Sequence, residues 1–299
     1  MTETPVRFGP EATRLMGVLT TPDTVPSVPL ACLLVNQGAG HRIGPARINV
    51  KLARRLARHG ISSIRLDLAG LGDSDAPGGG LGYIEQGVAD LQGAMNLVET
   101  MTGIRRFLHI GLCMGGVYGA VLGGQDARLA GLLMFDSFAF PGRRARLELA
   151  LRRILGLSFN ASLREKIANS LRGRFVARGG QIAEAPAPDD FVQRFRTAMT
   201  ALAERSVPVF MLSSGSLHVA DRRRDQLGAL ADESFAQNIE YHFDAALDHT
   251  LVTLESQRAF LDLACDWAQR VTQRAVAAPV STLAAGRAGS RHVPALANC

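Results

Sequence analysis

The chain has 299 residues, of which 47% are apolar and 20% are charged, a balance typical of a globular protein with a large core. Its longest apolar runs, 28–35 and 129–135, are too short to cross a bilayer, so we expect no stable membrane insertion. The first fourteen residues have no basic start followed by an apolar run. We therefore expect no secretory signal and a cytoplasmic protein.

The four cysteines form no CxxC pair and have no zinc-ligand spacing, and no glycine-rich dinucleotide motif lies between a strand and a helix. The sequence thus predicts neither a metal site nor a cofactor. Cys32 and Cys265 lie in apolar segments and are expected to be buried thiols in a reducing compartment.

The net charge of +6 is unevenly distributed, because residues 143–178 alone carry ten Arg or Lys against two Glu, a local net of +8. Aromatic residues do not interleave with these arginines, and no nucleic-acid-binding motif is present, so a nucleic-acid partner is not expected. Two interpretations stay open. The segment is either a solvated helical face or a surface that attracts anionic groups.

The first half of the chain alternates apolar runs with amphipathic stretches. A hairpin is expected over 6–22. Buried strands are expected at continuous apolar runs, which cover 29–36, 61–70, 105–112 and 129–135. Helices are expected where apolar residues recur at helical spacing, over 46–59, 84–101 and 114–124. This alternation predicts an α/β fold with a mainly parallel sheet flanked by helices.

The alternation stops after residue 142, and strands resume at 207–214 and 239–243, followed by a helix over 254–273. The interruption is rich in arginine and helix-like, which predicts a helical lid inserted over one end of the sheet. The last residues are rich in Ala, Gly and Pro with little period, which indicates a loose tail. The expected organisation is a core in two parts, a lid and a tail, at 1–142 and 206–273, 143–205, and 274–299.

The segment HIGLCMGGVYG, residues 109–119, places Cys113 between a predicted strand and a predicted helix. The pattern Gly111-x-Cys113-x-Gly115-Gly116 matches the strand–turn–helix motif that exposes a nucleophile, with cysteine at the position that usually carries serine. A thiolate there is favoured by the helix N-terminus and by a neighbouring imidazolium. We therefore expect Cys113 to be a nucleophile rather than a small buried residue.

Residues 5–272 resemble the α/β-hydrolase superfamily. The resemblance rests on the Cys113 turn together with VNQGAGH at 35–41, RLDLAGLGDSD at 65–75 and ALDHTLVTLE at 246–255. The G-x-C-x-G-G box is similar to the boxes of dienelactone hydrolases and polyhydroxyalkanoate synthases, a cysteine-nucleophile subtype. Outside the box the kinship with either is not close, so their substrates are not carried over.

The resemblance implies a Cys-His-Asp triad in which His249 is the base. Two residues are candidates for the acid, and we favour Asp136, which ends the predicted strand at 129–135, over Asp221 in the loop after the strand at 207–214. Asp248, adjacent to the histidine, is expected to shape its loop, because the side chains of consecutive residues rarely face each other.

An acyl-transfer site also needs donors for a tetrahedral oxyanion. The resemblance implies that these are the backbone N–H groups of Ala39 and Met114. Gln37, His41 and Arg42, in the loop after the strand at 29–36, are the candidate substrate-binding residues.

A cysteine nucleophile predicts an acyl-thioester intermediate, and thioesters react readily with amines, thiols and carbanions. We therefore expect an acyl-transfer enzyme acting on a thioester- or ester-activated group, such as one on coenzyme A or an acidic acyl-carrier protein attracted by the basic lid, in specialised metabolism. Two alternatives remain: an ester or lactone hydrolase, and a non-catalytic binding protein on the same fold. The identity of the acyl group, the acceptor and the oligomeric state are not indicated.

Overall fold

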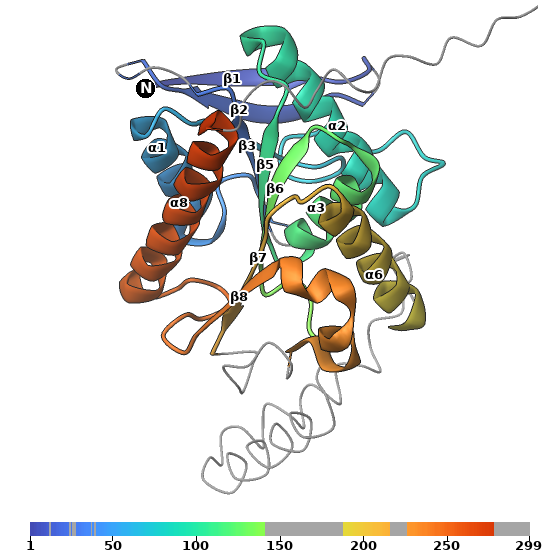
Figure 1. Cartoon of the computed structure of the whole chain (residues 1–299). Coiled ribbons are helices and arrows are strands. Elements are labelled where there is room, and N and C mark those ends of the chain that lie inside the picture. The colour runs from blue at the N-terminus through green and yellow to red at the C-terminus, as the bar shows by residue number, and fades with distance from the viewer. Residues whose placement is uncertain are drawn as a thin grey trace, which may run out of the picture.

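One sheet runs through the centre of the protein, which is described by a computed structural model (Figure 1). The structure describes residues 1–140 except 12, 24, 26, 27, 37 and 39, and then residues 188–215 and 226–277. The strands of the described chain are β1 Thr2–Phe8, β2 Leu15–Thr21, β3 Ala31–Val35, β4 Ser62–Leu66, β5 Phe107–Leu112, β6 Leu129–Phe135, β7 Val209–Ser214 and β8 Ile239–Asp244.

The strand order is β1-β2-β4-β3-β5-β6-β7-β8. β2 is antiparallel to both β1 and β4, and all other neighbours are parallel. The prediction of a mainly parallel sheet in an α/β fold is therefore confirmed. The carboxyl ends of β3, β5, β6, β7 and β8 lie at one edge, where ligands bind in open sheets of this kind.

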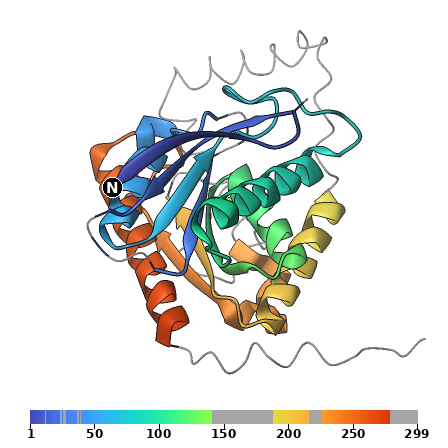
Figure 2. The ribbon, with the colours of Figure 1, turned by 90° about the horizontal axis from the view of Figure 1, so that it is seen from above.

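Helices cover both faces of the sheet (Figures 1 and 2). The helices of the described ranges are α1 Ile48–Arg58, α2 Tyr83–Thr102, α3 Met114–Gln125, α6 Pro188–Glu204 and α8 Leu254–Ala277, together with three short 3₁₀ turns at Pro45–Arg47, Gly228–Asp232 and Ser234–Asn238. Figures 1 and 2 place α1 and α8 on one face and α2, α3 and α6 on the other.

Each face has its own hydrophobic core, and the strands contribute to both. On β3, for example, Leu33 packs into the core below α2 and α3, whereas Cys32 and Leu34 pack into the core below α1 and α8. Strands buried on both faces need apolar residues at every position. This explains why the parallel strands could be read from continuous apolar runs.

The cysteines differ in exposure as the sequence predicts. Cys32 and Cys265 are fully buried, and burial raises the pKa of both thiols. Cys113 is the one cysteine within the described ranges that is partly exposed. A half-exposed thiol is accessible to a substrate, whereas the buried pair is expected to be inert.

The lid expected over 143–205 can be followed only from residue 188, because residues 141–187 lie outside the described ones. From there α6 packs against α3 and buries Phe195 and Leu202 in the core. The tail expected over 274–299 begins inside α8, and residues 278–299 lie outside the described ones. Among the described helices, none combines the length and the apolar character needed to cross a membrane.

Candidate active site

Cys113 forms a strained turn between β5 and α3. Its backbone has φ 52° and ψ −118°, a conformation that costs a non-glycine residue free energy and persists only when the surroundings fix it. The Cys113 N–H donates to the carbonyl of Phe135 on β6, at 2.8 Å. Two glycines make the turn possible: a Cβ on Gly111 would lie 2.3 Å from the backbone of Gly115, and a Cβ on Gly115 would lie 2.7 Å from the carbonyl oxygen of Val35.

His249 lies in the loop that joins β8 to α8. The preceding Asp248 shapes this loop, since its carboxylate accepts the backbone N–H groups two and four residues further on, at 3.0–3.1 Å. Leu251 has φ 50°, and its carbonyl accepts a hydrogen bond from Gln257 at the start of α8. Lys51 on α1 donates to Gln257 in turn, so the histidine loop is attached to both helices on that face.

Asp136 immediately follows β6 and also has a positive φ, 49°. Its side chain is fully buried and accepts hydrogen bonds from Ser214 and His249 among the described residues. Oδ1 accepts the N–H of Ser214 at 2.8 Å, and Oδ2 accepts the Ser214 hydroxyl at 2.5 Å. Nδ1 of His249 lies 3.0 Å from the same Oδ2, which fixes the tautomer with a proton on Nδ1 and orients Nε2 away from the carboxylate.

The histidine bridges the acid and the thiol. Hydrogen bonding to Asp136, followed by hydrogen bonding to Cys113, raises the pKa of His249 to about 10. Partial burial opposes this rise, but the attraction of the carboxylate and the sulfur exceeds it. At neutral pH the ring therefore carries a positive charge, and an imidazolium near a thiol is the arrangement that in general supports a nucleophilic sulfur. The Phe135 ring stacks on the imidazole, with centroids 6.4 Å apart.

Three of the residues predicted for this site lie outside the described ones: Gln37, Ala39 and Asp221. Met114 is the first residue of α3, where backbone N–H groups have no acceptor within the helix and are available to an oxyanion. The close approach of Gly115 to the backbone of Val35 and Asn36 brings the start of α3 beside the end of β3.

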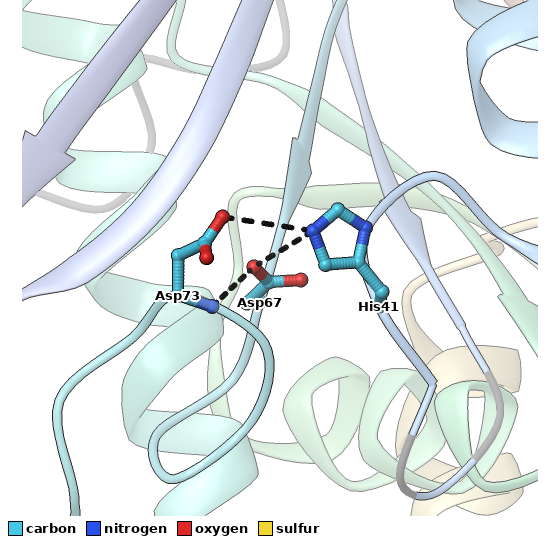
Figure 3. A group of neighbouring side chains, drawn as sticks. All are labelled: His41, Asp67 and Asp73. Atoms are coloured by element: carbon cyan, nitrogen blue, oxygen red, sulfur yellow. Dashed lines mark hydrogen bonds and ion pairs between the residues drawn. The ribbon is translucent and has the colours of Figure 1, made fainter.

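His41 belongs to a polar cluster with Asp67 and Asp73 (Figure 3), and Arg42 pairs with the same two carboxylates. Nε2 of His41 lies 3.7 Å from Asp67 and 3.6 Å from Asp73, and one ligand atom from each of the three lies within 4.8 Å of the others. However, the Arg42 guanidinium pairs with both carboxylates. The position that a metal ion would take is thus already filled by a cation, and the residues do not fit a metal centre.

This cluster joins the loops after β3 and β4. The Arg42 N–H also donates to Asp67, at 2.5 Å, and Asp67 has no exposed surface. A Cβ on Gly72 would collide with the Asp67 carboxylate, so the β4 loop wraps closely around it. Arg42 is 16% exposed, whereas His41 is 39% exposed. Of the two candidate substrate-binding residues that the structure describes, His41 is therefore the more accessible.

Two polar residues near the site were not singled out from the sequence. His109 on β5 is fully buried, and burial lowers its pKa to about 4. Its Nε2 bonds to the carbonyl of Gly115 in the turn, at 2.8 Å. Ser214 ends β7 and contacts Asp136 as described above. The available signal was that each polar residue interrupts or ends an otherwise apolar strand.

The site lies at the carboxyl edge of a mainly parallel sheet, with Cys113 after β5, Asp136 after β6 and His249 after β8. This fold and arrangement define an α/β hydrolase, an enzyme of the hydrolase type. The family model described as serine aminopeptidase, S33, matches residues 29–257. The chain therefore belongs to that family, although its turn carries cysteine.

Solved structures agree on the fold at low sequence identity. Proline iminopeptidase from Mycobacterium smegmatis is 17% identical with a TM-score of 0.60, and covers 91% of this chain and 100% of its own. An α/β serine hydrolase homologue from Coxiella burnetii is 13% identical with a TM-score of 0.57, over 89% and 97%. XC6422 from Xanthomonas campestris, described as an α/β serine hydrolase without a lid, is 11% identical with a TM-score of 0.56, over 93% and 97%. The comparison with curated proteins finds no match.

Proposed function

We propose that this hydrolase-fold enzyme transfers acyl groups through a thioester on Cys113. His249 would accept and donate protons, and Asp136 would be the carboxylate that orients it. The observation that carries the proposal is the bridging histidine. Its Nδ1 lies 3.0 Å from a buried carboxylate, and its interaction with the sulfur of a partly exposed, strained cysteine contributes to the rise of its pKa. Nucleophile, base and orienting group are thus connected in the order that covalent catalysis requires.

In the acylation step the Cys113 thiolate attacks the carbonyl carbon of the acyl donor, and a sulfur–carbon bond forms. The negative charge moves to the carbonyl oxygen, where the N–H of Met114 is a candidate donor. When the tetrahedral intermediate collapses, the bond to the leaving group breaks. His249 donates its Nε2 proton to that group, so a neutral imidazole remains beside a neutral thioester.

The acylated site is then prepared for the second step. Part of the rise in the pKa of His249 comes from hydrogen bonding and charge attraction to Cys113, and both are lost when the sulfur becomes a thioester. The pKa of His249 therefore falls after acylation. The neutral imidazole takes the proton of the acceptor, the acceptor attacks the thioester carbon, and the thiolate of Cys113 is released.

The acyl donor that we propose is activated and anionic, for example an acyl group on coenzyme A or on an acidic carrier protein in specialised metabolism. Support comes from the sequence, in which residues 143–178 carry a net charge of +8, a charge that attracts phosphates and carboxylates.

Hydrolysis of an ester or lactone is the second candidate. Membership of a family described as serine aminopeptidases favours it, because water is the acceptor in peptide hydrolysis. Adding an amine or an alcohol to the reaction separates the two functions. A transferase yields the conjugated product, whereas a hydrolase yields only free acid.

The test is intact-protein mass spectrometry after exposure to a panel of acyl-thioesters. We expect one acyl increment on the wild-type chain and none on Cys113→Ala. Cys265→Ala is the matched control, since it removes a fully buried thiol and should leave the increment unchanged. An increment that persists in Cys113→Ala, or no increment with any donor, would overturn the proposal.

A further inference from the structure

Within the described part of the chain, Ser214 makes two of the three hydrogen bonds that the Asp136 carboxylate accepts. Its backbone N–H donates to Oδ1 at 2.8 Å and its hydroxyl donates to Oδ2 at 2.5 Å. The third bond, from Nδ1 of His249, also goes to Oδ2. Ser214 and Asp136 are both buried, so water does not compete for these bonds. Ser214 therefore contacts the same oxygen atom as the catalytic imidazole.

The backbone bond shows how the carboxylate comes to lie there. β6 and β7 are parallel, and the N–H of Asp136 donates to the carbonyl of Leu212 at 3.0 Å. In a regular parallel ladder the next bond would run from the Ser214 N–H to the main-chain carbonyl of Asp136. Because Asp136 turns away with φ 49°, its side-chain Oδ1 accepts that bond instead. The carboxylate thus continues the sheet by one hydrogen bond.

One bond to Oδ1 does not fix the plane of a carboxylate, because the torsion about its last carbon–carbon bond is broad. A second donor on Oδ2 is needed to hold that oxygen toward the histidine. The Ser214 hydroxyl is this donor, and it comes from the same residue as the first. Its short contact, 2.5 Å, is in the range of a hydroxyl bonded to an ionised carboxylate.

We propose that Ser214 is a positioning residue, whose paired hydrogen bonds hold the Asp136 carboxylate in the plane that presents Oδ2 to His249. This inference rests on the proposed function, because it assigns to Ser214 an effect on the triad. In this assignment Ser214 does not react with the substrate. It acts through the carboxylate, which orients the imidazole.

Two variants test the assignment at neighbouring positions. Ser214→Ala removes the hydroxyl bonded to Oδ2. Ser213→Ala is the matched control, because Ser213 is equally buried and its hydroxyl has no hydrogen-bond partner among the described residues. Loss of a hydrogen bond to a charged group predicts a roughly 10- to 100-fold slower acylation of Cys113 in Ser214→Ala, with KM for the donor unchanged. Ser213→Ala should stay within about 2-fold of the wild type.

Rescue separates positioning from a packing effect. Ser214→Thr keeps the hydroxyl and adds a methyl group, so we expect it to recover most of the acylation rate. If Ser214→Ala is as fast as the wild type, or if both alanine variants lose the same rate, the inference is wrong. The same holds if Ser214→Thr is as slow as Ser214→Ala although it folds with wild-type stability.

The pH profile of Cys113 alkylation by iodoacetamide provides a readout that does not depend on turnover. If the hydroxyl holds Oδ2 toward His249, its removal weakens the imidazolium, and the midpoint of the profile moves to higher pH in Ser214→Ala. If the hydroxyl only competes with His249 for Oδ2, the midpoint moves to lower pH, which overturns the inference. Absence of acylation in the wild-type chain would overturn the proposed function instead, and the alkylation profile would still test Ser214.

Discussion

Asp136→Asn removes the charge that stabilises the His249 imidazolium without changing the shape of the side chain. In the wild type the Ser214 N–H donates to Oδ1 of Asp136 at 2.8 Å, and in the variant the amide oxygen can still accept this bond. The amide nitrogen then faces His249, whose Nδ1 must give up its proton to accept a hydrogen bond. The proton on Nε2 stays, the proton on Nδ1 is lost to solvent, and the ring becomes neutral. Cys113 loses both its counter-ion and its proton acceptor.

The size of this effect follows from the pKa of His249. A rise from 6.5 to about 10 corresponds to about 5 kcal/mol in favour of the imidazolium. The ring is 24% exposed, so solvent screening reduces this value. Part of the reduced value comes from the interaction of the ring with Cys113. Because Asp136 is the largest cause of the rise, we assign about 3–4 kcal/mol to it. Acylation of Cys113 should therefore slow by roughly 10²- to 10³-fold.

The assay is the rate of acyl-enzyme formation, followed by mass spectrometry after rapid quenching, together with the thermal midpoint of unfolding as a check on folding. Asp221→Asn is the control, because Asp221 is the other candidate for the acid, and it should acylate at the wild-type rate. The reasoning is refuted if Asp136→Asn, while folded, acylates within about 10-fold of the wild type. It is equally refuted if Asp221→Asn causes the larger loss.

Three further predictions concern stability. The folded-state pKa of His249 lies above its ordinary 6.5, so its stabilising contribution is complete below about pH 6.5 and is lost as the pH rises toward 10. The difference in urea stability between the wild type and His249→Gln should therefore shrink over that range, and a constant difference would contradict this. Gly119→Ala would place a Cβ 2.1 Å from the His109 ring and should destabilise by about 2 kcal/mol. By contrast, a Cβ on Gly124 would lie no closer than 3.5 Å to its nearest neighbour, so Gly124→Ala should stabilise the folded protein by about 0.5–1 kcal/mol. A Gly119→Ala variant that melts at a higher temperature than Gly124→Ala would refute the packing argument. Arg42→Ala leaves a fully buried carboxylate without its cation and should cost about 3 kcal/mol in chemical denaturation, whereas an effect below about 1 kcal/mol would show that the pair is dispensable.

The central strands β3 to β7 could be predicted because they are buried on both faces and bordered by turn-forming residues. The strand expected over 129–135 has the same bounds as β6. The helix expected over 84–101 extends by one residue at each end, Tyr83–Thr102. The helix expected from residue 46 begins at Ile48, since Pro45–Arg47 forms a 3₁₀ turn with positive φ at Ala46 and Arg47. Helix ends depend on such local turns, which periodicity does not reveal.

The candidate acid illustrates what pattern alone leaves open. Asp136 and Asp221 follow two neighbouring strands of the predicted sheet, and the sequence favoured Asp136, at the end of its strand, without excluding Asp221. Asp136 contacts His249 because its backbone turns out of the ladder at φ 49°, a property of the packed sheet edge. The role of Ser214 was missed for the same reason, since a serine at the end of an apolar strand does not show which side chain it faces.

The order of residues along the chain was enough to locate the strand–turn–helix at Cys113, the loop that contains His249, and the alternating strands and helices. Hydrophobic period, glycine spacing and strand–turn–helix context are local properties. Strand order, the carboxylate that pairs with the histidine, and the pairing of Arg42 with Asp67 were decided only by the tertiary structure. They arise where segments more than twenty residues apart meet at the sheet edge, and there direction and distance, rather than residue type, determine which groups interact.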